Sequence, residues 1–401
     1  MRQAYGIVIA GAGIAGLTAA ALLSQSGQQH RLKITVLDAG PRPVFSDADP
    51  VSLRVSAIAT GSADLLASIG AWDSIAAARA CAYDAMRVWD ENSVAESGAT
   101  LRFDAAEFAV SQLGFIVENC LVQHALLDVL DGSGVELVFD APIRAIEHGD
   151  GQYSLRLEDG QEWLADLVIG ADGARSFVRA AMGIETRDHA YGQEAVVAHL
   201  QPEKPHKSTA WQRFLHDGPL GLLPLADGRV SVVWSTSMAN ARRAMEVPDA
   251  DFGALLTEAS DRVLGRLELS SSRASFPLLA RHAERYVLPG VALIGDAAHA
   301  IHPLAGQGAN LGLQDAAKLT AVIDEALCND EHPGDRPVLR RYERARRGAN
   351  ASMLHLMTAL NRLFTTDSVL LKELRLTGMR LFNFSGPIRE QAVRVALGAR
   401  R

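Results

Sequence analysis

The sequence predicts an α/β fold in which a nucleotide-binding lobe alternates along the chain with a second lobe. Three features predict this class. They are a glycine-rich turn between an apolar strand and a helix near the N-terminus, two later apolar strands that end in glycine and aspartate, and alternating strands between them. The alternating strands predict an antiparallel sheet for the second lobe, and residues 331–401 predict helices. At 401 residues the chain is long enough for two lobes.

The first predicted unit is a strand, a turn, a helix and a second strand. Residues 6–10 (GIVIA) predict a buried strand, and residues 11–16 (GAGIAG) predict the turn. A helix of small and apolar residues continues to about Ser26, and residues 33–38 (KITVLD) predict the second strand. This order is that of a Rossmann-like dinucleotide-binding unit.

Four residues of this unit carry the binding prediction. Gly11 allows the tight turn, Gly13 lets a pyrophosphate approach the backbone, and Gly16 lets the helix pack on the strand. Asp38 ends the second strand, 22 residues after Gly16, and is placed to bind the adenosine ribose hydroxyls.

The segment VALIGDAAHAIHPLAGQGANLGL, residues 291–313, predicts a second contact with the same ligand. Gly306 and Gly308 have no Cβ, so their backbone can approach a planar ligand closely. A helix that starts near Ala309 directs N–H groups and a partial positive charge at the same place, which suits the anionic edge of a reduced flavin. Asp296 is placed to accept hydrogen bonds from a polyol such as the ribityl chain. Taken alone, the segment is also compatible with an ordinary strand–loop–helix.

A third strand, at residues 167–170, ends in Asp172-Gly173 and returns the chain to the nucleotide-binding lobe. We predict that this lobe is formed by residues 1–75, 100–185 and 286–330, the second lobe by 76–99 and 190–285, and a C-terminal helical segment by 331–401.

The patterns between these motifs predict the remaining elements. Strands of the second lobe are predicted at 194–200, 210–214, 220–225 and 230–235. An antiparallel meander is predicted at 135–139, 143–147 and 153–157. Helices are predicted at 58–69, 119–130, 252–267, 338–364, 369–382 and 388–397.

The composition indicates a globular protein of a reducing compartment. Hydrophobic residues make up 48% of the chain and charged residues 21%, which is enough apolar material for a core. Cys81, Cys120 and Cys328 are odd in number and form no Cys-x-x-Cys, which argues against disulfides and a zinc site. The apolar stretch 5–23 is interpreted as a buried strand and helix rather than a signal peptide or membrane span. We expect a cytoplasmic protein.

The net charge of −8 is unevenly distributed. From Arg336 onward 14 Lys/Arg stand against 4 Asp/Glu, a local balance of +10, so the rest of the chain carries −18. A basic, partly apolar C-terminus suits anionic lipid head groups or an acidic protein partner, and a solvated helix face explains it as well. The acidic main body argues against nucleic acid as a partner.

Three motifs, GAGIAG, GADGARS and GDAAHAIHPLAGQGANLGLQDA, resemble the fingerprints of FAD-dependent aromatic hydroxylases, the flavoprotein monooxygenases of the p-hydroxybenzoate hydroxylase type. The form HPLAGQGANLGLQDA resembles the ubiquinone-biosynthesis subgroup of these enzymes. So do LRVSAIATGSADLLASIGAW, LGFIVENCLVQHALL and the C-terminal RRYERARRGAN. The resemblance spans essentially the whole chain.

The resemblance implies FAD as the bound cofactor and a set of contacts to it. Arg54 and Gln123 would contact FAD from the side, and Asp172 would lie near the pyrophosphate. A surface ion pair, a helix cap and an Asp-Gly turn remain the respective alternatives for these three residues. The predicted cofactor set is Gly11, Gly13, Ala15, Gly16, Asp38, Arg54, Gln123, Asp172, Gly295, Asp296, Pro303, Gly306, Gln307, Gly308, Ala309 and Asn310, with Pro303, Gly306, Gln307 and Gly308 positioning the isoalloxazine.

The resemblance also implies the reaction. NAD(P)H would dock transiently as co-substrate and reduce the flavin. Oxygen would then form a C4a-hydroperoxyflavin, which hydroxylates the aromatic ring of a polyprenylated phenol in ubiquinone biosynthesis. Because the flavin is the reactive group, no catalytic side chain is assigned, and no metal is predicted: His299 and His302 are interpreted as structural or hydrogen-bonding. The alternatives are an FAD monooxygenase of a soluble aromatic or polyketide substrate and a non-catalytic flavin-binding scaffold.

The second lobe would supply the site for the hydrophobic aromatic substrate. The predicted lining residues are Trp211, Phe214, Leu222, Pro224 and Trp234, although apolar strand residues are more often plain core. A polyprenyl tail needs an apolar tunnel, and its enzyme would visit a membrane surface. We therefore expect peripheral contact with the inner membrane through the basic C-terminal helices. Assembly with other quinone-biosynthesis proteins is also expected.

Overall fold

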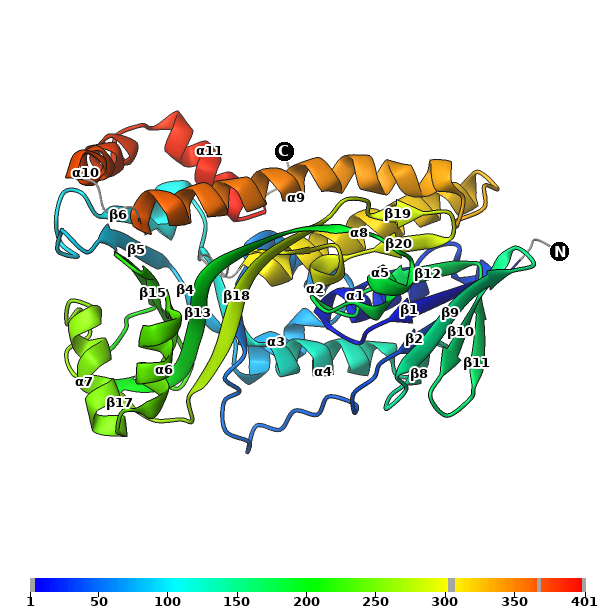
Figure 1. Ribbon diagram of the computed structural model, residues 1–401, viewed down its shortest axis with the longest axis horizontal. Coiled ribbons are helices and arrows are strands. Elements are labelled where there is room, and N and C mark those ends of the chain that lie inside the picture. The colour runs from blue at the N-terminus through cyan, green and yellow to red at the C-terminus, as the bar shows by residue number, and fades with distance from the viewer. Residues whose placement is uncertain (1–3, 302–306, 366–368, 399–401) are drawn as a thin grey trace.

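The protein folds into two main sheets that are connected by long strands and one long helix (Figure 1). The computed structural model describes residues 4–301, 307–365 and 369–398. A mostly parallel six-stranded sheet lies at one end and a largely antiparallel nine-stranded sheet at the other. Together with the C-terminal helices, this arrangement confirms the predicted α/β class.

The six-stranded sheet carries the glycine-rich unit at its centre. Its strands, in spatial order, are β19 (Val287–Leu288), β20 (Val291–Leu293), β12 (Leu167–Gly170), β1 (Tyr5–Ala10), β2 (Leu32–Leu37) and β8 (Glu136–Val138). All pairs are parallel except β19 with β20. Ile7 and Ile9 on one face and Val8 on the other are all buried, as expected for a parallel sheet that is covered on both faces.

Helices pack on this sheet and on each other. Helix α1 (Ile14–Ser24) contacts both α4 (Asn119–Leu130) and α8 (Gln307–Cys328). The short α5 (Phe177–Ala181) follows the loop after β12. A separate antiparallel sheet of β9 (Ile143–Gly149), β10 (Gln152–Leu157) and β11 (Glu162–Ala165) contacts β1 through β11.

Residues 135–139 do not belong to the predicted meander, which is a correction. Strand β8 pairs in parallel with β2, so that Leu137 lies opposite Val36 at the edge of the six-stranded sheet. The meander consists of β9, β10 and β11 instead. A strand of three residues shows the same alternation in either position, and its sequence therefore does not specify its neighbour.

The nine-stranded sheet is the core of the second lobe. Its strands, in spatial order, are β21 (His299–Ala300), β18 (Ala274–Ala283), β13 (Thr186–Pro202), β16 (Val230–Ser237), β15 (Gly218–Pro224), β14 (Thr209–Leu215), β5 (Ala85–Asp90) and β6 (Leu101–Asp104), and β17 (Leu267–Leu269) pairs with β13. One face packs against α6 (Met238–Glu246) and α7 (Asp249–Ala259). Residues 101–104, which the prediction assigned to the nucleotide-binding lobe, pair in this sheet. The rest of the lobe division stays a prediction.

A third sheet consists of β3 (Val55–Ala59), β7 (Gly114–Glu118) and β4 (Cys81–Tyr83), and helices α2 (Thr60–Ser68) and α3 (Trp72–Ala78) follow β3. The predicted helix 58–69 therefore begins too early, because Ile58 pairs with Phe115 in β3. The predicted helix 252–267 extends too far. It stops at α7, since Asp261 and Gly265 have φ of +57° and +70°, which no α-helix contains.

Three helices end the chain. Helix α9 (Arg336–Thr365) runs along the molecule in Figure 1 and contacts β19 near one end and β14 and β15 near the other. Helices α10 (Val369–Asn383) and α11 (Pro387–Ala396) follow. Within the ranges that the structure describes, no helix combines the length and the apolar character needed to cross a bilayer.

His199 of β13 is fully buried, and neither ring nitrogen has a hydrogen-bond partner among the described residues. It lies opposite Ser231 of β16, whose hydroxyl is likewise unpartnered. Burial lowers the pKa of His199 to about 4, because the imidazolium would lose its hydration; Arg229 adds to the decrease and Asp227 opposes it.

This histidine is expected to make folding pH-dependent. In the unfolded chain it binds a proton near its ordinary pKa of 6.5, whereas the folded chain resists protonation down to about 4. Its contribution to stability is thus present above pH 6.5 and is lost as the pH falls through this window, by roughly 2 kcal/mol at pH 5. Denaturant unfolding of His199→Leu should depend less on pH between 6.5 and 4 than that of the wild type. Parallel curves would contradict the assignment.

Candidate functional site

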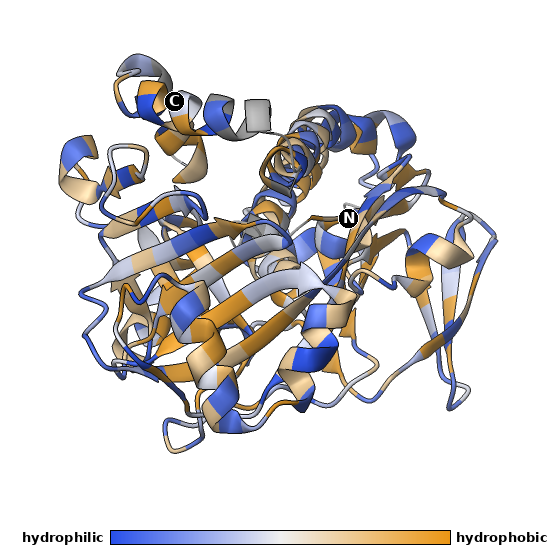
Figure 2. Cartoon of the chain, turned by 60° about the vertical axis from the view of Figure 1, so that its left-hand side comes forward, coloured by the Kyte–Doolittle hydropathy of each residue, from blue (hydrophilic) through white to orange (hydrophobic). Residues whose placement is uncertain are grey.

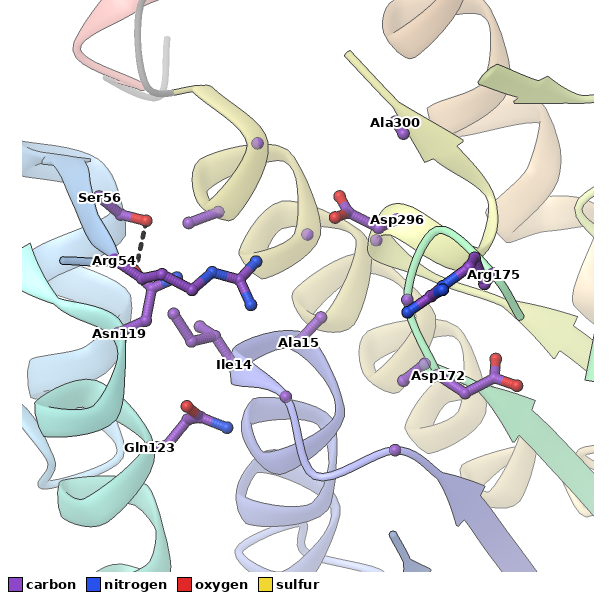
Figure 3. Close-up of a pocket in the computed structure, with 18 of the residues that line it drawn as sticks. Ile14, Ala15, Arg54, Ser56, Asn119, Gln123, Asp172, Arg175, Asp296 and Ala300 are labelled. Atoms are coloured by element: carbon purple, nitrogen blue, oxygen red, sulfur yellow. Dashed lines mark hydrogen bonds between the residues drawn. The ribbon is translucent and has the colours of Figure 1, made fainter. Parts of the chain in front are cut away.

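Segments that are far apart in the sequence converge on one cavity of about 970 Å³. The turn after β1, the end of β2, residues 52–56, the start of α4, the loop after β12 and the start of α8 all line it (Figure 3). The nine-stranded sheet closes the cavity with Ala195, Val197, Val233, Phe276 and Leu278. The glycine-rich turn and the two later glycine–aspartate segments of the sequence therefore border a single cavity.

The three glycines of the first turn differ in what requires them. Gly11 has φ of +107°, and a Cβ there would lie 2.4 Å from the carbonyl oxygen of Ala171. A Cβ on Gly16 would lie 2.0 Å from the carbonyl oxygen of Gly11, so Gly16 lets α1 pack on the turn without lining the cavity. Gly13 lines the cavity, and a Cβ on it would meet no protein atom within 4 Å. The fold requires Gly11 and Gly16, whereas Gly13 borders space for a ligand.

Asp38 holds this turn in place and also lines the cavity. One carboxylate oxygen accepts a hydrogen bond from the Ala12 N–H at 2.6 Å, and the other accepts one from the Gly40 N–H at 2.8 Å. A carboxylate has roughly four acceptor positions. Asp38 can therefore also accept hydrogen bonds from ligand hydroxyls.

Arg54, which directly precedes β3, and Gln123 of α4 approach the cavity (Figure 3). The Arg54 guanidinium points toward the middle of the cavity and has no ion pair or hydrogen bond with the described residues. Gln123 donates a hydrogen bond from Nε2 to the carbonyl of Ala12 at 2.9 Å. This contact ties α4 to the glycine-rich turn and replaces the helix-cap alternative.

Two aspartates line the cavity, but only one of them directs its carboxylate into it. One oxygen of Asp172 accepts from the Val178 N–H at 3.0 Å, while the other is buried without a partner among the described residues. The Asp296 carboxylate points into the cavity from the short 3₁₀ turn Gly295–Ala297 (Figure 3). It faces open cavity space but is surrounded by protein, and this burial raises its pKa, with His299 and Arg54 acting against the increase.

The start of α8 completes the wall, and Gly308 and Ala309 line it together with Ala15 of α1. Gly295 also lines the cavity, and a Cβ on it would lie 3.2 Å from the Ala15 Cβ. Asn310 does not line the cavity, which is a correction. Its amide binds the Ala59 N–H at 2.9 Å and the Ala57 carbonyl at 2.8 Å and so ties α8 to β3. Gln307 begins α8, and the predicted residues Pro303 and Gly306 lie outside the described residues.

A fully buried carboxylate, Asp315 of α8, supports the Asp296 turn from behind. One of its oxygens accepts from the Gly295 N–H at 3.1 Å and pairs with His299 Nε2 at 2.5 Å. The other accepts from Arg346 Nε at 2.7 Å and Asn350 Nδ2 at 3.1 Å. Burial alone would raise the pKa of Asp315, but His299 and Arg346 outweigh it and hold the pKa below its usual range.

This network also bears on the two histidines near the loop. His299 is bonded to Asp315, and His302 lies outside the described residues. In the described part of the chain, no three His, Cys, Asp or Glu side chains gather in a way that would hold a metal ion.

The cavity fits a dinucleotide cofactor such as FAD. The open space at Gly13 lies at the N-terminus of α1, where unpaired N–H groups bind phosphate. The carboxylate of Asp296 points into the cavity and is an acceptor that ligand hydroxyls would satisfy. Roles for the individual residues toward FAD stay a proposal.

A second cavity, of about 270 Å³, shares Val55 and Val233 with the first. We call it the apolar pocket. Most of its lining is hydrophobic, but Tyr83, Gln212 and Ser235 each present a side chain without a hydrogen bond to the described residues. Burial raises the pKa of Tyr83 to about 12, so its hydroxyl remains a donor at neutral pH. These three polar groups were not predicted from the sequence.

Four of the five predicted substrate residues do not line the apolar pocket, which is a correction; Trp211 does. Leu222 and Trp234 lie in the core on the opposite face of the sheet. Pro224 lies two residues after Leu222 in β15 and therefore on the same face as Leu222. Phe214 stacks on Phe364 of α9 with ring centroids 3.8 Å apart. Successive strand residues face opposite sides, and both faces of this sheet are apolar, so the sequence does not tell which face borders the pocket.

A dinucleotide cavity that adjoins an apolar pocket defines the class of the protein: an oxidoreductase whose bound cofactor faces an organic substrate. The model of the FAD binding domain family matches residues 4–356. The human protein "Ubiquinone biosynthesis monooxygenase COQ6, mitochondrial" is 36% identical, and the match covers 98% of this chain and 92% of the human one. The "3-demethoxyubiquinol 3-hydroxylase" of Escherichia coli K12 is 36% identical over 99% of both chains. The chain belongs to the FAD-dependent monooxygenases of ubiquinone biosynthesis, which confirms the predicted family, cofactor and enzyme class.

Solved structures agree with the fold. PqsL, described as a probable FAD-dependent monooxygenase from Pseudomonas aeruginosa, superimposes with a TM-score of 0.74 at 22% identity, covering 94% of this chain and 99% of that one. The p-nitrophenol 4-monooxygenase PnpA from Pseudomonas putida superimposes with a TM-score of 0.76 at 21% identity, covering 99% and 97%. At these identities the likeness concerns the fold alone.

Proposed function

We propose that the protein uses NAD(P)H and O₂ to hydroxylate the aromatic ring of a polyprenylated phenol in ubiquinone biosynthesis. The observation that carries this proposal is the shared wall of the two cavities. Val55 and Val233 border both, so a ring in the apolar pocket lies directly beside the cofactor cavity. The names of the relatives from human and E. coli support the pathway and the reaction type.

When bound, FAD supplies the oxygen chemistry, and the chain supplies position and environment. In the apolar pocket, Gln212 and Ser235 face the cavity from β14 and β16 and can hold the phenol hydroxyl. Tyr83 can donate a second hydrogen bond from β4. The hydrophobic remainder of the lining excludes water, which would otherwise consume the activated oxygen without product.

The proposal is tested with purified, FAD-loaded protein. Oxidation of NADH and of NADPH is measured with phenols that carry isoprenoid chains and with small, unprenylated phenols, and products are identified by mass spectrometry. We expect stimulation and a hydroxylated product with the prenylated phenols. Stimulation by small phenols alone would favour a soluble aromatic substrate. Absence of stimulation by every phenol would favour the flavin-binding scaffold.

Removal of the Gln212 amide is expected to weaken substrate binding. Gln212→Leu keeps the size of the side chain and should raise KM for a prenylated phenol about 10-fold, roughly 1.4 kcal/mol, which is the usual net value of one hydrogen bond. FAD content should not change, because Gln212 does not line the FAD cavity. The control is Gln201→Leu, at an exposed position of β13. Equal KM values for the wild type and Gln212→Leu would remove this residue from the site.

We further propose contact with the inner membrane from the cytoplasmic side, where other quinone-biosynthesis proteins would be partners. Leu381 in the last turn of α10 and Phe384 just after this helix are 66% and 87% exposed, and Arg380 beside them is exposed too. Apolar side chains with adjacent basic ones bind anionic lipid surfaces. Co-sedimentation with anionic liposomes should decrease in the double variant Leu381→Ser/Phe384→Ser. Equal binding by the variant and the wild type would rule out this surface.

A further inference from the structure

The apolar pocket opens to the surface beside the C-terminal helix. Ala392 and Ala396 of α11 line the pocket and are nevertheless exposed, so the pocket and the surface meet at these residues. Phe382 of α10 lines the same pocket, and its neighbours Leu381 and Phe384 are 66% and 87% exposed. An apolar path therefore leads from the pocket to the outer surface of α10. Figure 2 shows apolar and polar residues alternating along these C-terminal helices.

Helix α11 is held at both ends, so this opening has fixed sides. Near its C-terminal end, the carbonyl of Leu397 accepts hydrogen bonds from the Gly61 N–H at 2.9 Å and the Thr60 hydroxyl at 3.2 Å. Near its N-terminal end, Arg389 forms an ion pair with Glu107 at 2.5 Å.

The pocket is too small for a long hydrocarbon chain. A cavity of about 150 Å³ can hold benzene, so the 270 Å³ of the apolar pocket has room for a substituted ring with few further carbons. The tail of a polyprenylated phenol must then leave the pocket. The other alanines of the lining, Ala57, Ala59 and Ala210, are buried. The two alanines of α11 are exposed, so the wall is open at α11.

We infer that the hydrocarbon tail of the substrate leaves the apolar pocket between Ala392 and Ala396 of α11 and Phe382 of α10, and then lies along Leu381 and Phe384. This inference rests on the proposed function. It makes Ala392 and Ala396 specificity-determining residues for the tail rather than for the ring. Both lie beyond residue 356, where the match to the family model ends, so this determinant belongs to the C-terminal helices of the chain.

The test fills this opening and compares two tail lengths. Full-length, FAD-loaded Ala392→Trp is assayed with a phenol that carries one 3-methylbut-2-enyl group and with one that carries a farnesyl chain. We expect KM for the farnesyl phenol to rise at least about 10-fold, while KM for the short-chain phenol stays within about twofold. Substrate-induced changes in flavin absorbance give the two dissociation constants independently of turnover. Gln391→Trp, at an exposed neighbouring position that does not line the pocket, is the matched control.

Equal losses for both phenols, or no loss for either, would overturn the inferred path, as would the same selective loss in Gln391→Trp. If wild-type protein binds neither phenol, the proposed function itself fails. Should Ala392→Trp lose FAD or unfold at lower temperature, the milder Ala396→Leu gives the same comparison.

Discussion

A Gly13→Val variant is expected to fold like the wild type and to lose FAD. The Gly13 backbone has φ of −72° and ψ of +173°, which valine adopts without strain, and a Cβ there meets no protein atom within 4 Å. The new side chain would occupy the space at the N-terminus of α1 where a pyrophosphate approaches the backbone. We expect FAD affinity to fall at least about 100-fold, roughly 2.7 kcal/mol.

Flavin absorbance per protein and titration of apoprotein with FAD measure this loss, and thermal unfolding of the apoprotein checks the fold. Gly27→Val is the control, because Gly27 is also open and lies outside the cavity. Gly11→Ala should behave differently and damage folding as well, since its Cβ would lie 2.4 Å from a backbone oxygen. Normal FAD affinity in Gly13→Val would show that this turn does not contact the pyrophosphate.

The glycine-rich unit was predictable because its physical requirements are local. Strand β1, the turn, α1 and β2 each show their own pattern over a few residues, and the structure has them where the sequence placed them. Strand β18 was missed because Pro277, Arg281 and His282 interrupt its pattern. Pro277 pairs next to the register shift of β13, where a proline is tolerated in a sheet.

The site was less predictable than the fold, because its groups come from separate elements. Gln212 and Ser235 carry no local signal, and they face the pocket only because of the side of the sheet on which they lie. The predicted Leu222 and Trp234 are neighbours of pocket residues along their strands, so strand alternation places their side chains on the opposite face of the sheet. Asn310 directly follows the cavity residues Gly308 and Ala309 in sequence, but helix geometry turns its amide toward β3. Convergence in space, rather than residue type, decides these cases.

Asp315 was not predicted as a site residue either, because its partners come from separate elements. Removal of its carboxylate is expected to destabilise the fold strongly. Asp315→Ala removes the acceptor for Gly295, His299, Arg346 and Asn350 in the buried interior. Because breaking a buried charge network leaves uncompensated polar groups, we expect a loss of about 3–5 kcal/mol in the free energy of unfolding. Denaturant unfolding measures it, and Glu325→Ala, exposed on the same helix, should change stability by less than about 0.5 kcal/mol.

The pH dependence identifies the carboxylate as the cause. The folded pKa of Asp315 lies below its ordinary value of 3.8, so its contribution is present above that value and is lost as the pH falls through the folded pKa. The stability difference between wild type and Asp315→Ala should thus be largest near neutral pH and shrink in acid below about pH 4. FAD should also bind more weakly, because the Gly295 N–H that precedes Asp296 loses its acceptor. A stability difference that stays constant down to acid pH would mean that packing, and not the ionised network, accounts for the effect.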